Sequence, residues 1–576
     1  MARNIIAVTL LLLTFGLAQP GHAGASSPCP RPAPGSEVLP PPDLYSSNGV
    51  LNVALTYNTA VDELGVTLFC FVTSDGLESP TLHVNPGDTI NITLTNMVPG
   101  APGAPAEVVS NRGRVCGSDT MTLTSTNMHF HGINASPRCH SDEVIRTLVN
   151  SGQTFTYKIK IPKNEPPGLY WYHPHVHSIS SPNVLGGGTG AIIVEGIENI
   201  QPAVAGLPQR LLVLRDQLLP YLPTQGSDKP FWNLSVNYTL VPYPTYPPAI
   251  IKMQSGAKEF WRVANASANS ILDLQVMYDG KPQPLQIVGL DGVPTGSQDG
   301  KRQGTIITRK NIFLPPAGRA EFIVTGPDAG VKQATVITNY IDSGPAGDFL
   351  PARRLAVIQQ AAKATRLPKM PAVSKAPNRQ RFEELADAKV TGKRKLFFYE
   401  VFTESRVPPP NRAAKRKPPE DQNMVFFITV DGDVNRPYDP NNPPAIVTTK
   451  GAVEDWTIEN RTTELHEFHM HQIHFLLLEI NGKKVPKKDQ QFYDTFNVPY
   501  WDGESPKFPS IKVRMDLRGA VTGEFVYHCH ILDHEDLGMM AIIRVNSAKD
   551  SAKAVKPPRR GLTTAQSGKG SVRLAG

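Results

Sequence analysis

Residues 86–96 read Pro-Gly-Asp-Thr-Ile-Asn-Ile-Thr-Leu-Thr-Asn, a turn followed by a strict alternation of apolar and polar residues. Such alternation indicates a half-buried β-strand, because successive side chains of a strand point to opposite faces. The pattern recurs after Gly256 and after Gly451. In all three copies, apolar residues stand five and seven positions after the glycine and an asparagine stands nine positions after it. The glycines are a domain's length apart, so the repeat predicts three related all-β domains.

A second repeat links only the first and last of these domains. Residues 168–175 and 523–530 both run from a glycine to Tyr-His-x-His, where x is Pro174 in one copy and Cys529 in the other. The middle domain has no counterpart, and we expect it to be structural. Short alternating strands, frequent turns and no sustained helical periodicity favour Greek-key β-sandwiches.

The repeats and the composition divide the chain, because 576 residues are too many for one hydrophobic core. We expect a signal peptide over 1–23, domain 1 over 45–197, domain 2 over 205–362, a linker over 363–394, domain 3 over 395–547 and a disordered basic tail over 548–576. Much of the formal charge of +7 lies in the linker, in Arg406–Lys417 and in the tail. These segments are expected to be unstructured, and they lack the interleaved aromatic residues typical of nucleic-acid binding.

The start of the chain is typical of an exported protein. Arg3 precedes an apolar run from Ile5 to Leu17, and Gly21-His22-Ala23 offers small residues for cleavage. The run is too short to span a bilayer, and no later stretch reaches the roughly 18 apolar residues of a membrane helix. The sequence therefore predicts a secreted or periplasmic protein without a membrane span. It does not indicate the oligomeric state, and we take a monomer as the working expectation.

Cysteine usage agrees with an oxidising compartment. Cys29, Cys70, Cys116 and Cys139 allow three pairings, and the sequence alone does not choose among them. Cys116 with Cys139 is the pairing that we favour, because the segment between them carries the first histidine pair. Closing such a loop would stabilise the fold by about 3 kcal/mol.

Histidines carry the functional signal. Ten of the fifteen lie in four short clusters, and there is no histidine between His177 and His466. The clusters are His129 with His131; His173 with His175; His466, His469 and His471; and His528, His530 and His534. The metal chemistry therefore sits at the two ends of the chain, and the fold must bring those ends together.

The last cluster encloses Cys529, and Met539 follows ten residues later. Two histidines, one cysteine and a weak axial methionine form the blue-copper electron-transfer arrangement. In a strand, His528 and His530 face one way and Cys529 the other, so one tripeptide touches two metal sites. Zinc would need about four ligands and no redox partner, and this donor set exceeds that need.

The four motifs in this order resemble those of three-domain, laccase-like multicopper oxidases over most of residues 45–547. The resemblance implies cupredoxin-like domains and four copper ions: one type 1, one type 2 and two type 3. It places His466, Cys529 and His534 around the type 1 copper, with Met539 axial. It gives His129 and His469 to the type 2 copper, and to the type 3 pair His131, His173, His175, His471, His528 and His530.

The family commonly has proline where this chain has Glu467, which we expect to change the stiffness of a loop near the type 1 site. His177 and His474 are additional histidines, interpreted as hydrogen-bonded or surface residues. Because dioxygen reduction consumes protons, we consider Glu535 and Asp142 as proton carriers, with a purely orienting role for both as the equal alternative.

The resemblance implies an oxidase that takes single electrons from a phenol-like or other small reductant and reduces dioxygen to water. One alternative is an oxidase of cuprous, ferrous or manganous ions, which would need a methionine-rich or carboxylate-rich patch near the type 1 site. Another is a copper-sequestering protein without turnover, although that role would not need Cys529 between two type 3 ligands.

Overall fold

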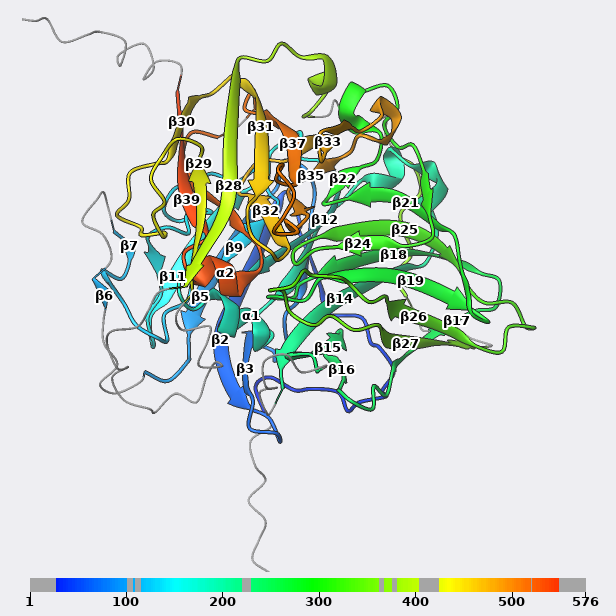
Figure 1. Cartoon of the computed structure of the whole chain (residues 1–576). Helices are drawn as coiled ribbons and strands as arrows, with labels where there is room; N and C mark the ends of the chain where they lie inside the picture. Colours follow the sequence, from blue (N-terminus) through cyan, green and yellow to red (C-terminus); the bar gives the residue numbers. More distant parts are fainter. Residues whose placement is uncertain are drawn as a thin grey trace, which may run out of the picture.

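The computed structural model describes residues 27–100, 107–108, 115–219, 229–361, 367–374, 381–402, 424–519 and 521–547. The expected signal peptide, the Arg406–Lys417 stretch and the expected tail lie outside these residues. Strands dominate, and the only α-helices of the described part are α1 (Ser180–Leu185) and α2 (Leu532–Asp536). Figure 1 shows three β bodies that follow the chain, coloured blue to cyan, green, and yellow to red. The all-β prediction is confirmed.

The first sandwich has sheets of order β11-β5-β2-β3 and β1-β4-β13-β12-β9, with the small pairs β10-β7 and β6-β8 beside them. The strand bounds are β1 Asp43–Tyr45, β2 Val50–Val61, β3 Thr67–Thr73, β4 Thr81–Val84, β5 Thr89–Asn96, β6 Glu107–Val108, β7 Cys116–Gly117, β8 Thr120–Met121, β9 His129–His131, β10 Thr147–Leu148, β11 Thr154–Lys160, β12 Gly168–His173 and β13 Gly190–Val194.

The middle sandwich has sheets of order β16-β15-β14-β18-β25-β21-β22 and β17-β27-β26-β19-β20, with β23 on β21 and β24 on β19. The strand bounds are β14 Gln209–Leu218, β15 Trp232–Val236, β16 Thr239–Val241, β17 Ala249–Met253, β18 Lys258–Asn265, β19 Leu272–Tyr278, β20 Lys281–Pro282, β21 Leu285–Leu290, β22 Val293–Pro294, β23 Ile307–Arg309, β24 Ile312–Leu314, β25 Arg319–Thr325, β26 Ala334–Thr338 and β27 Arg353–Gln360.

The last sandwich has sheets of order β29-β28-β31-β37-β33-β34 and β30-β39-β38-β32-β36, with β35 on β33. The strand bounds are β28 Gly392–Phe402, β29 Met424–Val430, β30 Ile446–Thr449, β31 Val453–Asn460, β32 His466–Met470, β33 Phe475–Ile480, β34 Lys483–Lys484, β35 Phe492–Tyr493, β36 Thr495–Val498, β37 Ser510–Asp516, β38 Gly523–Cys529 and β39 Met540–Asn546.

The repeated sequence pattern forms the same strand in each sandwich. β5, β18 and β31 each pair in parallel with the first strand of their own sheet in chain order (β2, β14 and β28) and antiparallel with a later one (β11, β25 and β37). The asparagine that ends each copy is fully buried, and its amide bonds backbone carbonyls of neighbouring loops. Asn96 donates to Thr124 and Val149, Asn265 to Ser270 and Leu314, and Asn460 to Glu464 and Val498. This buried amide explains the spacing of the repeat.

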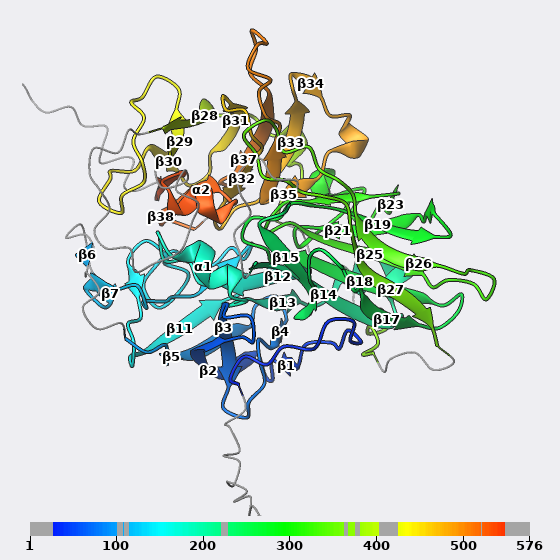
Figure 2. The same cartoon turned by 60° about the horizontal axis from the view of Figure 1, so that its bottom comes forward.

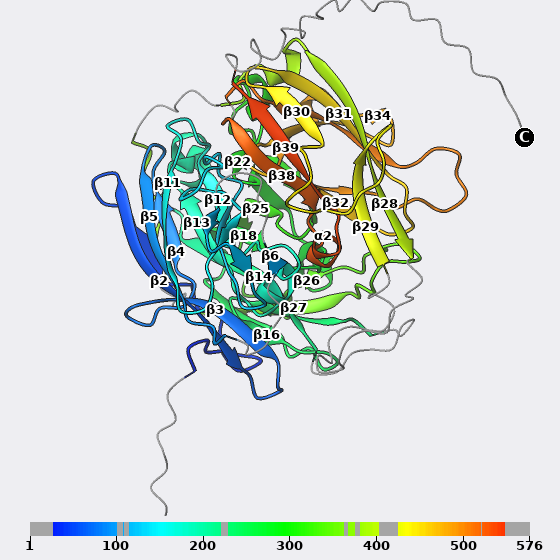
Figure 3. The same cartoon turned by 90° about the vertical axis from the view of Figure 1, so that its left-hand side faces the viewer.

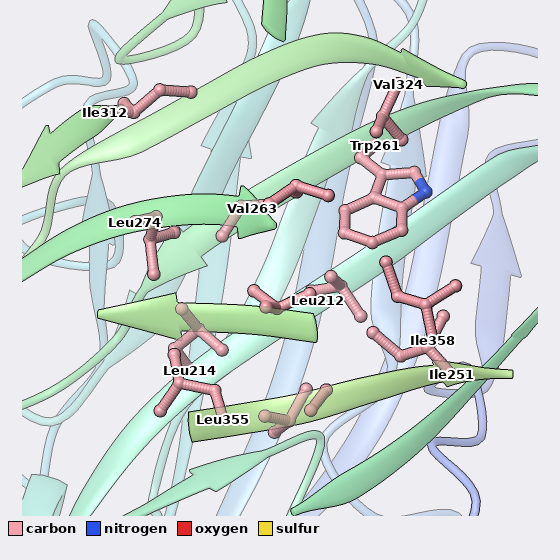
Figure 4. Packing of buried hydrophobic residues seen from close by; sticks show 14 of the residues in the cluster. Leu212, Leu214, Ile251, Trp261, Val263, Leu274, Ile312, Val324, Leu355 and Ile358 are labelled. Atoms are coloured by element: carbon pink, nitrogen blue, oxygen red, sulfur yellow. The ribbon is translucent and has the colours of Figure 1, made fainter. Parts of the chain in front are cut away.

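Apolar residues of the repeat enter the core of each sandwich. In the middle one, Trp261 and Val263 point between the two sheets toward Leu212, Ile251 and Leu355 (Figure 4). Full burial of such side chains contributes about 1.5–3 kcal/mol each. The first and last sandwiches have equivalent cores of their own.

Three smaller apolar clusters join the sandwiches. One containing Trp171 and Ala264 joins the first to the middle, and one containing Ile145 and Val526 joins the first to the last. A third packs Leu185 of α1 and Leu532 of α2 against middle-sandwich residues such as Ile271. Figure 2 shows α1 and α2 where the three sandwiches meet, and Figure 3 shows α2 in the same arrangement from another side.

Part of the expected linker over 363–394 is not solvated, so that expectation is wrong for the described residues from 381 onward. Phe382 and Leu385 are fully buried and pack with Val293 of the middle sandwich and Leu476 of the last. Arg381 is also buried and donates to the carbonyl of Gln472. Because the segment is mostly charged, its composition did not indicate that a few apolar residues would fill the space between the middle and last sandwiches.

Two disulfides stabilise the first sandwich and the segment before it. Cys116 bonds Cys139, which confirms the favoured pairing, and Cys29 bonds Cys70. In the described part of the chain, no helix has the length and apolar character needed to cross a membrane.

His83 in β4 ties strands of the first sandwich together. Its Nδ1 lies 2.6 Å from a carboxylate oxygen of Glu195, its Nε2 lies 3.1 Å from one of Asp43, and its ring stacks on Tyr45. Burial alone would lower the pKa of His83. The hydrogen bonds and negative charges of its two carboxylate partners outweigh burial and raise it.

Candidate metal centres

Strand pairing places the histidine clusters against one another. β9 pairs with β12, so His129 lies opposite His173, and β32 pairs with β38, so His469 lies opposite His528. These strands meet near the centre of the molecule in Figure 1. The rings of His129 and His471 stack with centroids 3.9 Å apart, across the boundary between the first and last sandwiches. The two ends of the chain are thus brought together, as the distribution of histidines requires.

Three donors converge beside the core of the last sandwich. The Sγ of Cys529 lies 3.6 Å from His466 Nδ1 and 3.8 Å from His534 Nδ1, and the two nitrogens are 3.1 Å apart. Ligands held about 2.0 Å (nitrogen) and 2.3 Å (sulfur) from one ion show such separations. Each imidazole turns its other nitrogen away: His466 Nε2 lies 2.8 Å from the Thr462 hydroxyl, and His534 Nε2 lies 3.5 Å from Glu464.

Met539 is fully buried in the same core as Cys529. Two backbone bonds hold it there, since Cys529 N–H donates to its carbonyl at 3.1 Å and its own N–H donates to the His534 carbonyl at 3.0 Å. This placement is compatible with the axial role that the resemblance implies.

The other eight histidines form one buried cluster with three groups of convergent nitrogens. The groups are His129 with His131 and His469; His131 with His173 and His530; and His175 with His471 and His528. Six of the eight have a buried ring nitrogen without a hydrogen-bond partner: His129, His131, His173, His469, His471 and His530. Buried polar atoms rarely lack partners, so this concentration of lone pairs fits bound cations.

The protonation states suit metal binding. Burial, the largest cause, lowers the pKa to about 3 at His528 and well below the usual value at His131, His173, His175, His466, His469, His471 and His530. Neutral imidazole is the form that binds metals. Burial raises the pKa of the Cys529 thiol, so a metal bound there would displace a proton.

Hydrogen bonds fix the orientation of several rings. His469 Nδ1 donates to the Asp494 carbonyl at 2.8 Å, and His528 Nδ1 donates to the Cys529 carbonyl at 2.8 Å. His129 Nδ1 lies 2.9 Å from Asp142 Oδ1. Such partners set which nitrogen faces an ion.

Asp142 and Glu535 have different surroundings. Asp142 Oδ1 also accepts the Phe130 N–H at 3.0 Å, and its Oδ2 accepts Gln472 Nε2 at 2.6 Å, which suits an orienting role. Glu535 is fully buried, 3.8 Å from His175 Nδ1 and 3.9 Å from His528 Nδ1.

Burial raises the pKa of Glu535 well above its usual value, with the neighbouring Asp536 adding to the shift. The Ser180 hydroxyl donates to Glu535 at 3.3 Å and opposes the shift without reversing it. Glu535 is therefore a buried carboxyl with a raised pKa beside the histidine cluster, whereas both carboxyl oxygens of Asp142 are engaged in hydrogen bonds.

Glu467 lies inside β32 and not in a loop, so the expected effect on loop stiffness is wrong. Its side chain is fully buried, and Oε1 accepts Asn497 Nδ2 at 3.1 Å. Burial raises the pKa of this carboxyl to about 8. Its backbone N–H donates to Cys529 Sγ at 3.4 Å, a bond that a proline could not make.

Of the two additional histidines, His474 is hydrogen-bonded as expected, whereas His177 is neither exposed nor hydrogen-bonded at Nδ1. His474 is buried and its Nε2 donates to the Asp291 carbonyl at 2.7 Å, as expected for a hydrogen-bonded residue. His177 packs its ring against Tyr438, and one of its ring nitrogens lies within 4.8 Å of carboxylate oxygens of Glu535 and Asp536.

Sequence reasoning missed four residues around the sites: Thr462, Glu464, Arg319 and Asp494. The first two lie just before His466, where polar neighbours of a ligand could have been suspected. Arg319 and Asp494 belong to no motif, and Arg319 comes from the middle sandwich, which has no ligand of its own. Only the folded arrangement reveals them.

Comparison with known proteins agrees with this picture. Family models described as multicopper oxidase match residues 120–199 and 407–549. "Multicopper oxidase mco" of Staphylococcus haemolyticus is 22% identical over 482 residues, covering 82% of this chain and 83% of that protein.

Two solved structures have the same fold. A multicopper oxidase from Campylobacter jejuni, described as a metallo-oxidase, aligns with a TM-score of 0.62 at 22% identity over 89% of this chain and 96% of that one. McoA from Aquifex aeolicus aligns with a TM-score of 0.61 at 19% identity over 89% and 99%. The chain resembles multicopper oxidases over both outer sandwiches and has their cupredoxin-like fold. It is an oxidoreductase.

Proposed function

We propose that this enzyme passes electrons singly from a small reductant to a cluster that reduces dioxygen to water. The observation that carries the proposal is the position of Cys529. Its sulfur lies 3.6 Å from His466 and 3.8 Å from His534, while the adjacent His528 and His530 belong to the eight-histidine cluster. Cys529 is joined through the backbone to His528 on one side and to His530 on the other. Two covalent paths therefore connect the proposed electron-entry site to the proposed oxygen-reducing site.

Four copper ions would supply the one-electron transfer and the reduction of dioxygen. The type 1 ion would be held by His466, Cys529, His534 and Met539. The type 2 ion would be held by His129 and His469, and the type 3 pair by His131, His173, His175, His471, His528 and His530. The unpartnered nitrogens and the low histidine pKa values support this assignment.

The protein surroundings would control protons and water. Reduction of one dioxygen to two waters takes four electrons and four protons, so protons must cross the buried shell. Glu535 is the best-placed carrier, because it lies 3.8 Å and 3.9 Å from the Nδ1 atoms of two proposed ligand histidines and burial favours its protonated form. Asp142 would orient His129 through its hydrogen bond and would be the second candidate for proton transfer.

Electrons would enter at His534. Its residue exposure is 7%, whereas His466, Cys529 and Met539 are 0% exposed. The reductant would be a phenol-like or other small molecule, for which Glu464 beside His534 Nε2 can accept the proton released on oxidation.

A second candidate is the oxidation of cuprous, ferrous or manganous ions. Glu464 lies 3.5 Å from His534 Nε2, and its carboxyl hydrogen-bonds that of Glu400. This pair partly supplies the carboxylate patch that a metal oxidase would need. The Campylobacter jejuni relative described as a metallo-oxidase supports the same candidate. A copper-sequestering role would leave the position of Cys529 unexplained.

The two disulfides support folding outside the cytoplasm, and we propose export to the periplasm or the exterior.

Oxygen uptake would test the function. The copper-loaded enzyme is supplied in turn with phenols, aromatic amines and cuprous, ferrous and manganous ions. We expect uptake with at least one class, without accumulation of peroxide, and none after Cys529→Ser, whose hydroxyl is a poor copper ligand. Near-normal uptake by Cys529→Ser would contradict the proposal. Glu464→Gln separates the candidates, since a selective loss of metal-ion oxidation favours the second.

A further inference from the structure

The middle sandwich supplies no ligand histidine, yet Arg319 extends from it to the histidine cluster. Arg319 begins β25 and is almost fully buried. Its Nη1 donates to Asp494 Oδ1 at 2.7 Å and its Nη2 donates to Oδ2 at 2.6 Å. This bidentate geometry makes a strong and directional pair of hydrogen bonds.

Asp494 in turn contacts one ligand histidine from each outer sandwich. Its Oδ1 lies 3.2 Å from His131 Nε2, and its backbone carbonyl accepts His469 Nδ1 at 2.8 Å. The remaining nitrogens of these rings, His131 Nδ1 and His469 Nε2, are the unpartnered atoms that face the candidate metal position. Asp494 therefore orients two ligand histidines on opposite sides of the domain boundary, His469 of the proposed type 2 site and His131 of the proposed type 3 pair.

Arg319 is itself held by all three sandwiches. Its Nε donates to the Leu169 carbonyl of the first sandwich at 3.2 Å, and its Nη1 also donates to the Ala317 carbonyl of the middle one at 2.9 Å. Asp291 reinforces the arrangement, because it accepts the backbone N–H of Arg319 at 2.8 Å and that of Asp494 at 3.2 Å. The guanidinium cannot shift without disturbing several buried hydrogen bonds.

The glycine that ends the first histidine motif makes room for this pair. Gly132 has φ +86°, and a Cβ there would lie 2.7 Å from Arg319 Nη2 and 2.8 Å from Asp494 Oδ2. Any larger residue would push against the ion pair, so a glycine is needed directly after His131.

We propose that Arg319 is a positioning residue for the type 2 copper. By fixing Asp494, it aligns the type 2 ligand His469 and also the type 3 ligand His131, and the middle sandwich thereby sets the geometry of a cluster to which it gives no ligand. The inference rests on the proposed assignment of these histidines as copper ligands. Removal of Arg319 leaves Asp494 buried without its cation, so this residue turns toward other donors and no longer holds the type 2 ligand His469 or the type 3 ligand His131.

The test compares Arg319→Met with Arg262→Met. Arg262 is an equally buried arginine on the paired strand β18, and its partners Glu321 and Gln209 lie within the middle sandwich. Both variants lose a buried ion pair, but only Arg319 reaches the histidines. The readouts are total copper, the type 2 electron paramagnetic resonance signal, the blue absorption band and the melting temperature of the copper-free protein.

We expect Arg319→Met to lose type 2 copper affinity by roughly 10-fold or more while keeping the blue band, as is typical when a partner of a metal ligand is removed. Arg262→Met should lower the melting temperature similarly and keep the type 2 signal. Equal loss of type 2 copper in both variants would overturn the proposal, and so would an unchanged type 2 spectrum in Arg319→Met.

If Arg319→Met does not fold, Gly132→Ala and Arg319→Lys provide the test. Gly132→Ala displaces the Arg319–Asp494 ion pair. Arg319→Lys keeps the positive charge but makes one hydrogen bond fewer to Asp494. Wild-type type 2 spectra from both would overturn the proposal, and a weakened type 2 signal in both would support it. The type 2 spectrum of the wild-type protein distinguishes failure of this inference from failure of the proposed function. If the wild-type protein shows no type 2 signal, the proposed function itself is contradicted.

Discussion

The backbone N–H of Glu467 should raise the reduction potential of the type 1 copper, and Glu467→Pro should lower it. The N–H lies 3.4 Å from Cys529 Sγ in a fully buried setting, and proline has no N–H to replace it. The Glu467 carbonyl accepts the His530 N–H at 2.8 Å, a bond that proline retains. The substitution therefore removes one hydrogen bond to the sulfur and preserves the neighbouring backbone contact.

The size of the effect follows from the charge on the sulfur. A hydrogen bond to a charged acceptor contributes about 1.5–3 kcal/mol. The sulfur becomes more negative on reduction, and because the electron is shared with copper, roughly half of this energy, about 1 kcal/mol, favours the reduced state. For a one-electron couple a tenfold change in equilibrium is 59 mV, so about 1 kcal/mol corresponds to a fall of about 40 mV.

The assay is a redox titration of the blue band at pH 6, where a carboxyl with a pKa of about 8 is protonated. Glu467→Leu is the matched control, because it removes the carboxyl and keeps the N–H. We expect the reduction potential of Glu467→Pro to be about 40 mV lower than that of Glu467→Leu. Equal potentials in the two variants would show that the N–H does not tune the site, and a higher potential in the proline variant would refute the reasoning.

Four further predictions concern single features. Met539→Leu should keep the type 1 copper and raise its potential, because leucine donates no electron density to the oxidised ion; a fall in the redox titration would remove Met539 as axial ligand. Glu535→Gln should slow reoxidation of the blue band by oxygen more than its bleaching under nitrogen in rapid mixing; equal slowing would indicate a structural role. Replacing Cys116 and Cys139 by alanine should cost about 3 kcal/mol in denaturant unfolding, and an unchanged midpoint would contradict the loop-closure estimate. Because the pKa of His83 is raised in the folded protein, protonation of this residue stabilises the fold. The stabilisation is fully present below pH about 6.5 and is lost as the pH rises through the pKa of the folded state. The unfolding midpoint of the wild type should therefore fall above pH 6.5 more steeply than that of His83→Gln, and parallel curves would oppose this.

Local pattern was enough to predict the all-β fold class. The alternation after Gly87, Gly256 and Gly451 reports a strand buried on one face, and the buried asparagine at its end repeats in three places. The pairing of Cys116 with Cys139 was also predictable, because the two cysteines bracket a histidine pair. These features depend on neighbours in sequence or on a repeated unit.

Other features depend on contacts that no local pattern encodes. Arg319 and Asp494 are 175 residues apart and meet only because three sandwiches pack around the histidines. Phe382 and Leu385 fill a gap between two sandwiches, inside a stretch whose composition resembles a solvated linker. The change in loop stiffness expected at Glu467 does not apply, because strand β32 continues through this residue and pairs with β36.

Anomalous diffraction at the copper edge, on crystals of the copper-loaded protein, tests the four-copper assignment most directly. One peak should lie between His466, Cys529 and His534, and three should lie within the eight-histidine cluster on both sides of the boundary between the first and last sandwiches. Fewer than three peaks in the cluster, or no peak beside Cys529, would contradict it.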